Sequence, residues 1–178
     1  MVIAQDHKRI FDGDAGPNTG GMGAYTPVPQ IPEEAVQQAI SQVLKPTAKG
    51  MVAEKRPFQG ILYAGLIQTA TGPKVIEFNA RFGDPETQVV LARLESPLSE
   101  IISSLLAKEQ PTIAWNELAS VGVVVAAEGY PNQYKTNLPL PEMSGETIYY
   151  AGVTRSEQAL VSAGGRIFLA EATASTLE

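Results

Sequence analysis

Residues 60–78 form the pattern that most narrows the possible folds of this chain. Residues 60–69 are a largely apolar run with the length of a buried strand, and residues 74–78 form a second, shorter run. The segment between them, residues 70–73, is rich in residues that favour turns. The pattern predicts a β-hairpin.

Helices are predicted on both sides of this hairpin. Apolar residues recur at roughly helical spacing over residues 32–55, and acidic residues in the first turn suit the helix dipole. Pro46 should kink or restart this helix because proline has no N–H to donate. After the hairpin, Asp84 is expected to cap a helix over residues 85–94, and a further helix is expected over residues 97–108.

The chain becomes β-rich after residue 119. We predict a strongly apolar strand over residues 121–127 and shorter strands over residues 147–153 and 165–171. The change in character near residues 110–118 marks the expected boundary between two lobes. The order of helices and strands indicates an α+β fold.

The N-terminal region is unusual because residues 5–32 are rich in Gly, Asp and Pro and show little periodicity. A loop of about 28 residues is usually functional or disordered, and apolar residues such as Phe11 and Met22 favour an ordered one. Residues 1–4 are predicted as the end of a strand without a preceding partner, and residues 175–178 match a helix capping box. Both ends indicate a piece of a longer polypeptide, with a disordered tail as the alternative at the C-terminus.

Composition excludes several classes of protein and site. The apolar fraction of 44% and the charged fraction of 18% are typical of a globular protein, and the net charge of −6 argues against a nucleic-acid binder. The absence of cysteine excludes thiolate metal sites, and the single histidine, His7, excludes a multi-histidine site. Because no apolar run approaches the ~20 residues of a membrane span and no secretory signal is visible, we expect a cytoplasmic protein without membrane contact.

The strongest chemical signal lies at the end of the hairpin. Alternate side chains of a strand share a face, so Glu77, Asn79 and Arg81 point together if the extended conformation continues. A carboxylate and an amide oxygen are hard ligands suited to Mg²⁺, and a neighbouring guanidinium could stabilise phosphoryl charge. The alternative is a strand that ends in solvent, with Glu77 and Arg81 simply paired.

A second signal is the glycine-rich segment at residues 16–25. Its glycines permit positive φ and close approach of backbone amides to a ligand, and Asn18 and Thr19 add side-chain hydrogen bonds. The segment lacks the Gly-Lys-Ser/Thr of a Walker loop, and Gly23 stands where an EF-hand loop needs its bidentate Glu. A flexible surface loop is the alternative interpretation.

A third signal begins at Asp6, directly after the first predicted strand. Lys8 and Arg9 are candidate phosphate ligands. His7 could act as a general base because imidazole titrates near neutral pH, although a lone His beside Asp is more often a structural or charge pair. Trp115, the only tryptophan, is predicted to anchor the core or a lobe interface.

These segments, in this order, resemble the phosphoribosylamine–glycine ligase family of ATP-grasp enzymes. The sequence PNTGGMGAY followed by EFNARFGDPETQ is highly specific, and the resemblance covers nearly the whole chain. It implies that residues 1–110 are the second half of an ATP-grasp core, an antiparallel sheet with flanking helices. Residues 111–178 would be part of a small β-rich C-terminal domain. The matching segments are residues 5–9, 16–25, 62–66, 75–88 and 122–131.

The resemblance implies an enzyme of purine biosynthesis that joins glycine to 5-phosphoribosylamine with ATP through a glycyl phosphate, releasing ADP and phosphate. Glu77 and Asn79 would bind Mg²⁺ or Mn²⁺, and Ile76 would face the adenine. Lys8 and Arg81 would be catalytic residues near the phosphoryl group. The implied substrate-binding residues are Arg9, Asn18, Thr19, Gly20, Gly21, Met22, Gly23 and Asp84.

Gly65 departs from the wider ATP-grasp pattern, which places an acidic metal ligand on the strand before the Glu-x-Asn strand. We therefore expect more water or phosphate oxygens around the metal. Family enzymes are much longer, so the resemblance implies that an N-terminal part of the same polypeptide is missing. The chain alone is therefore expected to be inactive. We expect it to be a monomer or a weak dimer. Another ATP-grasp carboxylate–amine ligase, or a non-catalytic ATP-grasp-like binding module, stays open as an alternative.

Overall fold

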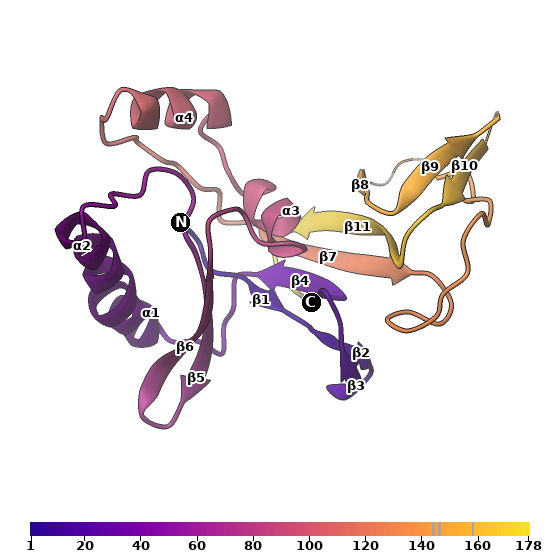
Figure 1. Ribbon diagram of the computed structural model, residues 1–178, viewed down its shortest axis with the longest axis horizontal. Helices are drawn as coiled ribbons and strands as arrows, with labels where there is room; N and C mark the ends of the chain where they lie inside the picture. The colour runs from indigo at the N-terminus through magenta and orange to yellow at the C-terminus, as the bar shows by residue number, and fades with distance from the viewer. Residues whose placement is uncertain (144, 146, 158) are drawn as a thin grey trace. The chain divides into compact units, whose positions relative to one another are not determined.

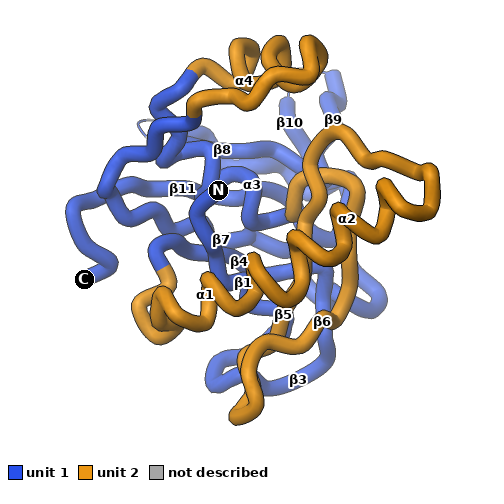
Figure 2. The backbone as a smooth tube through the Cα atoms, turned by 90° about the vertical axis from the view of Figure 1, so that its left-hand side faces the viewer, with its two compact units in different colours: residues 1–27, 84–96, 113–178 blue, residues 28–83, 97–112 orange. Residues whose placement is uncertain are grey.

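The computed structural model describes residues 1–143, 145, 147–157 and 159–178 (Figure 1). The chain divides into two compact units (Figure 2). Unit 1 contains residues 1–27, 84–96 and 113–178, and unit 2 contains residues 28–83 and 97–112. Because each unit combines segments that are far apart in the sequence, each is described by itself.

Within the described residues, unit 1 is built on a five-stranded antiparallel sheet in the order β1-β4-β7-β11-β8 (Figure 1). β4 from the N-terminal region pairs with β7 from the second half of the chain, with Gly23 opposite Val123. N-terminal and C-terminal segments therefore share one sheet. Its strands are β1 (Gln5–Asp6), β4 (Gly23–Thr26), β7 (Ala119–Ala126), β11 (Arg166–Ala174) and β8 (Thr147–Tyr150).

Unit 1 also contains the hairpins β2–β3 and β9–β10 and the helix α3, which contacts β4 and β7. Ala24, Val89 and Val90 form a buried cluster between this helix and the sheet, and Trp115 packs against it. Of the two predicted roles for Trp115, an anchor of the core or of a lobe interface, the contact with this cluster confirms the first. The bounds are β2 (Arg9–Phe11), β3 (Ala15–Asn18), β9 (Val153–Ser156), β10 (Ala159–Ser162) and α3 (Glu86–Leu91).

Strand β7 shows why the helix lies so close to the sheet. Its residues 120, 122 and 124 are buried and its residues 121, 123 and 125 are exposed, as expected for a strand with one covered face. A Cβ on Gly122 would lie 3.0 Å from Cγ1 of Val89 on α3 and 2.9 Å from Leu169 on β11. The missing side chain therefore lets α3 and β11 pack tightly around β7.

Unit 2 combines consecutive helical segments with the predicted hairpin. α1 contacts β6, and the side chain of Gln38 lies beside Gly72 at the hairpin turn. Pro46 lies in the first turn of α2, directly after a π-helical segment, so the predicted restart of the helix is confirmed. The bounds are α1 (Glu33–Ala39), the π-helix η1 (Ile40–Leu44), α2 (Lys45–Ala53), β5 (Tyr63–Thr69), β6 (Gly72–Asn79) and α4 (Leu98–Leu106).

The α+β class and its antiparallel sheet agree with the prediction, but several elements differ. Residues 5–32 are not one long loop, since they contain the strands β1 to β4, and residues 1–4 are not a strand. The strand predicted over residues 147–153 is interrupted at residues 151–152, and β9 begins after the break. Among the residues that the structure describes, no helix is long and apolar enough to cross a membrane.

Candidate functional site

Glu77 and Asn79 share one face of the β5–β6 hairpin. They lie two residues apart on β6 without an irregularity between them, so their side chains project to the same side. Across the hairpin, Gly65 pairs with Glu77 and Tyr63 pairs with Asn79. Because Glu77 is exposed and Asn79 is half-buried, neither side chain is enclosed in an apolar interior.

Gly65 leaves room for the Glu77 side chain, because a Cβ at Gly65 would lie 3.1 Å from Cγ of Glu77. The described residues contain no cluster of three or more His, Cys, Asp or Glu side chains that could hold a metal ion. Glu77 and Asn79 contribute one carboxylate and one amide oxygen to this face. Such a set fits Mg²⁺ or Mn²⁺ when phosphate or water oxygens complete the coordination.

Ile76 and Arg81 flank this pair in different ways. Ile76 is the extra residue of a β-bulge, between the pairs Gly65–Glu77 and Leu66–Val75, and it is 66% exposed. β6 ends at Asn79, so the extended conformation needed to bring Arg81 onto the same face does not continue. The Arg81 guanidinium donates instead to the carbonyl of Phe82, at 2.8 Å.

The glycine loop of unit 1, residues 16–23, contains the positive φ angles that its sequence predicts. Gly16 and Gly21 have φ of 81° and 112°. A Cβ at Gly21 would collide with Pro85 and lie 2.7 Å from Oδ1 of Asp6, so both the backbone conformation and the close packing require glycine there.

The amides of residues 19–22 hydrogen-bond inside the protein. This corrects the expectation that they are open to a ligand, because the amides of Thr19 and Met22 donate to backbone carbonyls of residues 7–8, and those of Gly20 and Gly21 donate to side-chain hydroxyls. A substrate at the loop would therefore meet its side chains and carbonyls. The bonds run from Thr19 N to Lys8 O (2.7 Å), Gly20 N to Tyr130 Oη (3.0 Å), Gly21 N to Thr19 Oγ1 (3.0 Å) and Met22 N to His7 O (2.7 Å).

Lys8 forms an ion pair with a buried carboxylate that the sequence analysis did not select. Its Nζ lies 2.8 Å from Oδ2 of Asp6, whose side chain is only 7% exposed. Burial raises the pKa of the Asp6 carboxyl, and the nearby Glu86 raises it further, whereas Lys8 lowers it. The spacing of Asp6 and Lys8, two residues apart after a strand, was the available signal for this pair.

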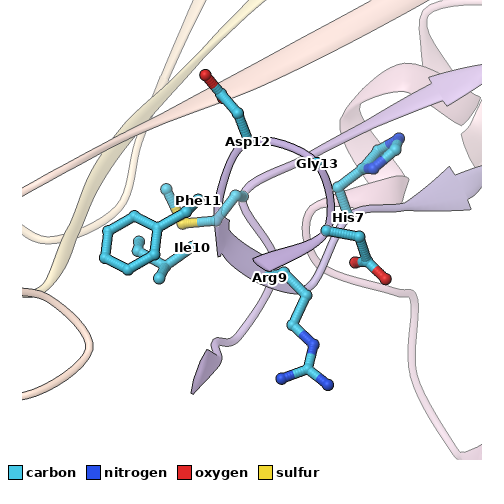
Figure 3. Close-up of a pocket in the computed structure, with 8 residues that line it drawn as sticks. His7, Arg9, Ile10, Phe11, Asp12 and Gly13 are labelled. Atoms are coloured by element: carbon cyan, nitrogen blue, oxygen red, sulfur yellow. The ribbon is translucent and has the colours of Figure 1, made fainter. Parts of the chain in front are cut away.

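The β2–β3 hairpin borders a surface pocket of about 320 Å³ next to the loop (Figure 3). Arg9 closes this hairpin by donating to the carbonyl of Gly16, at 2.6 Å, and it pairs in register with the exposed Asn18. Figure 3 shows Arg9 and Asp12 extending to opposite sides. His7, also at the pocket, stacks on Tyr25 with ring centroids 5.7 Å apart.

Asp84 does not cap α3, because the N-cap is Pro85 and no side chain caps this helix. Its Oδ2 instead accepts from Nη2 of Arg166, at 2.7 Å. Nη1 of the same arginine donates to the carbonyl of Gly20, at 3.0 Å. Arg166 and Tyr130, which bind the glycine loop from the second half of the chain, were not predicted as site residues. Tyr130 lies in the matching segment 122–131, which was given no role in the site, and no local motif identifies Arg166.

Unit 1 therefore brings together Lys8, Asp84 and residues 19–22 of the predicted site, with Arg9 and Asn18 on the adjoining hairpin. Unit 2 presents Ile76, Glu77 and Asn79 on β6. The group in unit 1 includes cationic side chains suited to an anion, and the group in unit 2 includes oxygen donors suited to a cation. Two expectations were wrong, because Arg81 does not share the face of Glu77 and Asn79 and the amides of residues 19–22 are already hydrogen-bonded.

Family models identify both regions of the chain. The model of the phosphoribosylglycinamide synthetase ATP-grasp (A) domain matches residues 1–87, and the model of the C domain of the same synthetase matches residues 120–178. The first match defines an ATP-grasp region, in agreement with the fold. Since the two matches together cover most of the sequence, the chain belongs to the phosphoribosylglycinamide synthetase family.

Curated relatives have names that agree with this assignment. A phosphoribosylamine–glycine ligase of Halalkalibacterium halodurans is 56% identical over 99% of this chain and 42% of the relative. One from Lactococcus lactis subsp. lactis is 58% identical over 97% of this chain and 43% of the relative. The chain thus spans less than half the length of the curated relatives that it matches.

Solved structures match the fold over almost the whole chain. The crystal structure of phosphoribosylamine–glycine ligase from Thermotoga maritima superposes with a TM-score of 0.90 at 32% identity, covering 99% of this chain and 44% of that one. Phosphoribosylglycinamide synthetase from Anaerococcus prevotii matches with a TM-score of 0.62 at 13% identity, over 99% of this chain and 44% of that one, a likeness of fold alone.

Proposed function

We propose that this chain is part of an enzyme that joins glycine to 5-phosphoribosylamine with ATP. The family assignment and the names of the relatives support the reaction. The structural observation that supports it best is the shared, accessible face of Glu77 and Asn79 opposite Gly65. This face offers a carboxylate and an amide oxygen with space around them, as a cation between protein and nucleotide phosphates requires.

In this proposal Glu77 and Asn79 hold Mg²⁺ or Mn²⁺. When bound, the cation neutralises charge on the ATP phosphates during phosphoryl transfer to the glycine carboxylate, which forms the glycyl phosphate. Ile76, exposed at the bulge, packs against the adenine. Arg81, whose guanidinium is exposed at the end of β6, provides positive charge for the transferred phosphoryl group.

The residues of unit 1 position the other reactants. The Lys8 side chain is half exposed, so its ammonium can attract a phosphoryl oxygen while the Asp6 carboxylate holds the ammonium in place. Arg9, Asn18, Asp84 and the glycine loop orient glycine and phosphoribosylamine. The loop does so through a fixed shape, since the amides of residues 19–22 are already hydrogen-bonded within the protein.

We propose further that residues 1–110 are the second half of an ATP-grasp core and that residues 111–178 are part of the C domain. In the described residues, the β5–β6 hairpin pairs with no other strand, and an isolated two-stranded hairpin is only marginally stable in water. The rest of a full-length ligase would supply the neighbouring strands and the other half of the nucleotide site. Nothing in this proposal requires more than a monomer.

An activity assay tests the proposed function. A full-length ligase that contains this chain is expected to release ADP in the presence of both glycine and phosphoribosylamine, and glycine is expected to exceed other small carboxylates in kcat/KM. The isolated 178-residue chain is expected to show no turnover above background. Preference for a different carboxylate, or no turnover by the full-length protein, would contradict the proposal. So would robust turnover by the isolated chain.

A further inference from the structure

Two side chains from the C-domain region, Arg166 and Tyr130, hold the glycine loop of the ATP-grasp region. Both lie within the segment that matches the C-domain family model, whereas Gly20 and Gly21 lie within the segment that matches the ATP-grasp model. The contacts join residues more than a hundred positions apart in the sequence. The shape of the loop therefore depends on a part of the chain outside the ATP-grasp region.

Arg166 uses its guanidinium to join three acceptors. Nη1 donates to the carbonyl of Gly20 at 3.0 Å and lies 3.3 Å from that of Gly21, while Nη2 donates to Asp84 at 2.7 Å. The Arg166 side chain is 22% exposed, so most of it is packed and ordered. A planar fork with several donors suits this task, whereas a lysine ammonium cannot match its geometry.

Gly20 allows the guanidinium to lie directly against the loop. A Cβ at Gly20 would lie 3.1 Å from Cζ of Arg166 and 3.2 Å from its Nε. A side chain at position 20 would therefore press on the guanidinium and force it to shift by a few tenths of an ångström. The glycine at this position thus allows the loop to pack closely against the Arg166 guanidinium.

Tyr130 binds the other backbone group of Gly20, its amide. Its Oη accepts from the Gly20 amide at 3.0 Å. The Tyr130 ring fills the space that a side chain at Gly165 would need, directly beside Arg166 in the sequence. Tyr134 packs on the ring, with centroids 6.2 Å apart. The carbonyl and the amide of Gly20 are therefore both bound by C-domain side chains.

We infer that Arg166 and Tyr130 are positioning residues that fix the glycine loop in the conformation that binds glycine or phosphoribosylamine. The inference rests on the proposed function for the role of the loop, while the contacts themselves stand on the structure. Neither residue needs to touch a substrate. Their loss should weaken substrate binding at the loop and leave the metal–nucleotide face of β6 unchanged.

Hydrogen exchange in the full-length enzyme tests the contacts directly. Tyr130→Phe removes the acceptor of the Gly20 amide, so exchange at this amide should accelerate by about tenfold, the effect of losing one ordinary hydrogen bond. Arg166→Met should accelerate exchange across residues 20–22. Tyr134→Phe and Arg155→Met are matched controls, because both side chains are exposed and phenylalanine keeps the ring at position 134, and both should leave exchange unchanged.

Steady-state kinetics of the same proteins test the role in binding. Arg166→Met is expected to raise KM for glycine or phosphoribosylamine about tenfold, with kcat within about threefold and KM for ATP within about twofold of the wild type. Arg166→Lys keeps the charge but not the fork, so it should recover only part of the loss.

Faster exchange together with a raised substrate KM supports the inference. Unchanged exchange in both variants contradicts it, and faster exchange with an unchanged substrate KM reduces the contacts to a structural role and overturns the positioning role. If the wild-type enzyme fails to ligate glycine and phosphoribosylamine, the proposed function fails, while the exchange data still decide whether the two side chains hold the loop.

Discussion

Asp6 shows how the surroundings of one side chain shape the candidate site. The carboxylate is buried beneath the glycine loop, where Gly21 leaves space for it, and its charge is opposed by Glu86 and balanced by Lys8. Burial is the largest effect and disfavours the ionised form. The Lys8 ammonium, a proposed catalytic group, is therefore held by a carboxylate whose own charge depends on this environment.

The pKa of Asp6 is a direct prediction at this scale. NMR titration of its carboxyl carbon should give a midpoint above the ordinary aspartate value; Lys8→Met should raise it further and Glu86→Gln should lower it. With a raised pKa, the folded protein binds this proton more tightly than the unfolded chain does. The contribution of Asp6 to the free energy of unfolding therefore decreases as pH rises from the ordinary aspartate pKa of the unfolded chain to the raised pKa of the folded protein. Lys49→Met, an exposed control in unit 2, should change nothing. A midpoint at or below the ordinary value would contradict the prediction.

Site residues could be predicted where the chemical groups that act together are close to each other in the sequence. Glu77 and Asn79 share a face because strand geometry alone places them together. Asp84 resembles a helix cap in the local sequence, yet its carboxylate pairs with Arg166, a residue far along the chain. Tyr130 and Arg166 were missed for the same reason, because their partners in the glycine loop are far away in the sequence. Asp6 was missed although its partner Lys8 is only two residues away, because its burial beneath the glycine loop depends on tertiary structure.

At the scale of elements, Gly122 on β7 determines how closely α3 approaches the sheet. A Cβ at this position would lie between Val89 and Leu169, and it would fit only if one of these neighbouring side chains moved. Gly50 in α2 is the opposite case, because a Cβ there would meet no atom within 4 Å. The same substitution should therefore have opposite effects at the two sites.

Gly122→Ala is expected to destabilise the protein by about 1–3 kcal/mol, the usual cost of overpacking a tightly packed core. Gly50→Ala should stabilise α2 by about 0.5–1 kcal/mol, because alanine loses less backbone entropy in a helix. Urea unfolding of both variants and the wild type measures these free energies. Equal stability of Gly122→Ala and the wild type would show that β7 and α3 are not packed as described.

The elements also differ in how far the sequence could predict them. The β5–β6 hairpin was predictable because its strands are adjacent and joined by turn-forming residues. β1 and β4 were not, since they are only 2 and 4 residues long and β4 pairs with β7 from the second half of the chain. Strands this short have no measurable periodicity, and their pairing depends on the sheet as a whole.

At the scale of the whole molecule, the sheet of unit 1 joins the ATP-grasp and C-domain regions, because β4 pairs with β7. The contacts of Arg166 and Tyr130 with the glycine loop join the same two regions of the chain. In unit 2, the β5–β6 hairpin presents Glu77 and Asn79 without further strands among the described residues. This arrangement fits a chain that spans less than half of its curated relatives and that we propose works with the rest of a ligase.

The central claim is that Glu77 and Asn79 hold the divalent cation against ATP. The most direct test is the Mg²⁺ concentration that gives half-maximal activity of the full-length ligase, measured for the wild type, Glu77→Gln and the control Glu109→Gln, an exposed carboxylate in the same unit. We expect Glu77→Gln to need at least about tenfold more Mg²⁺ and to lose about 10²–10³-fold in kcat, and we expect the control to match the wild type. The same Mg²⁺ dependence and kcat in all three proteins would contradict it.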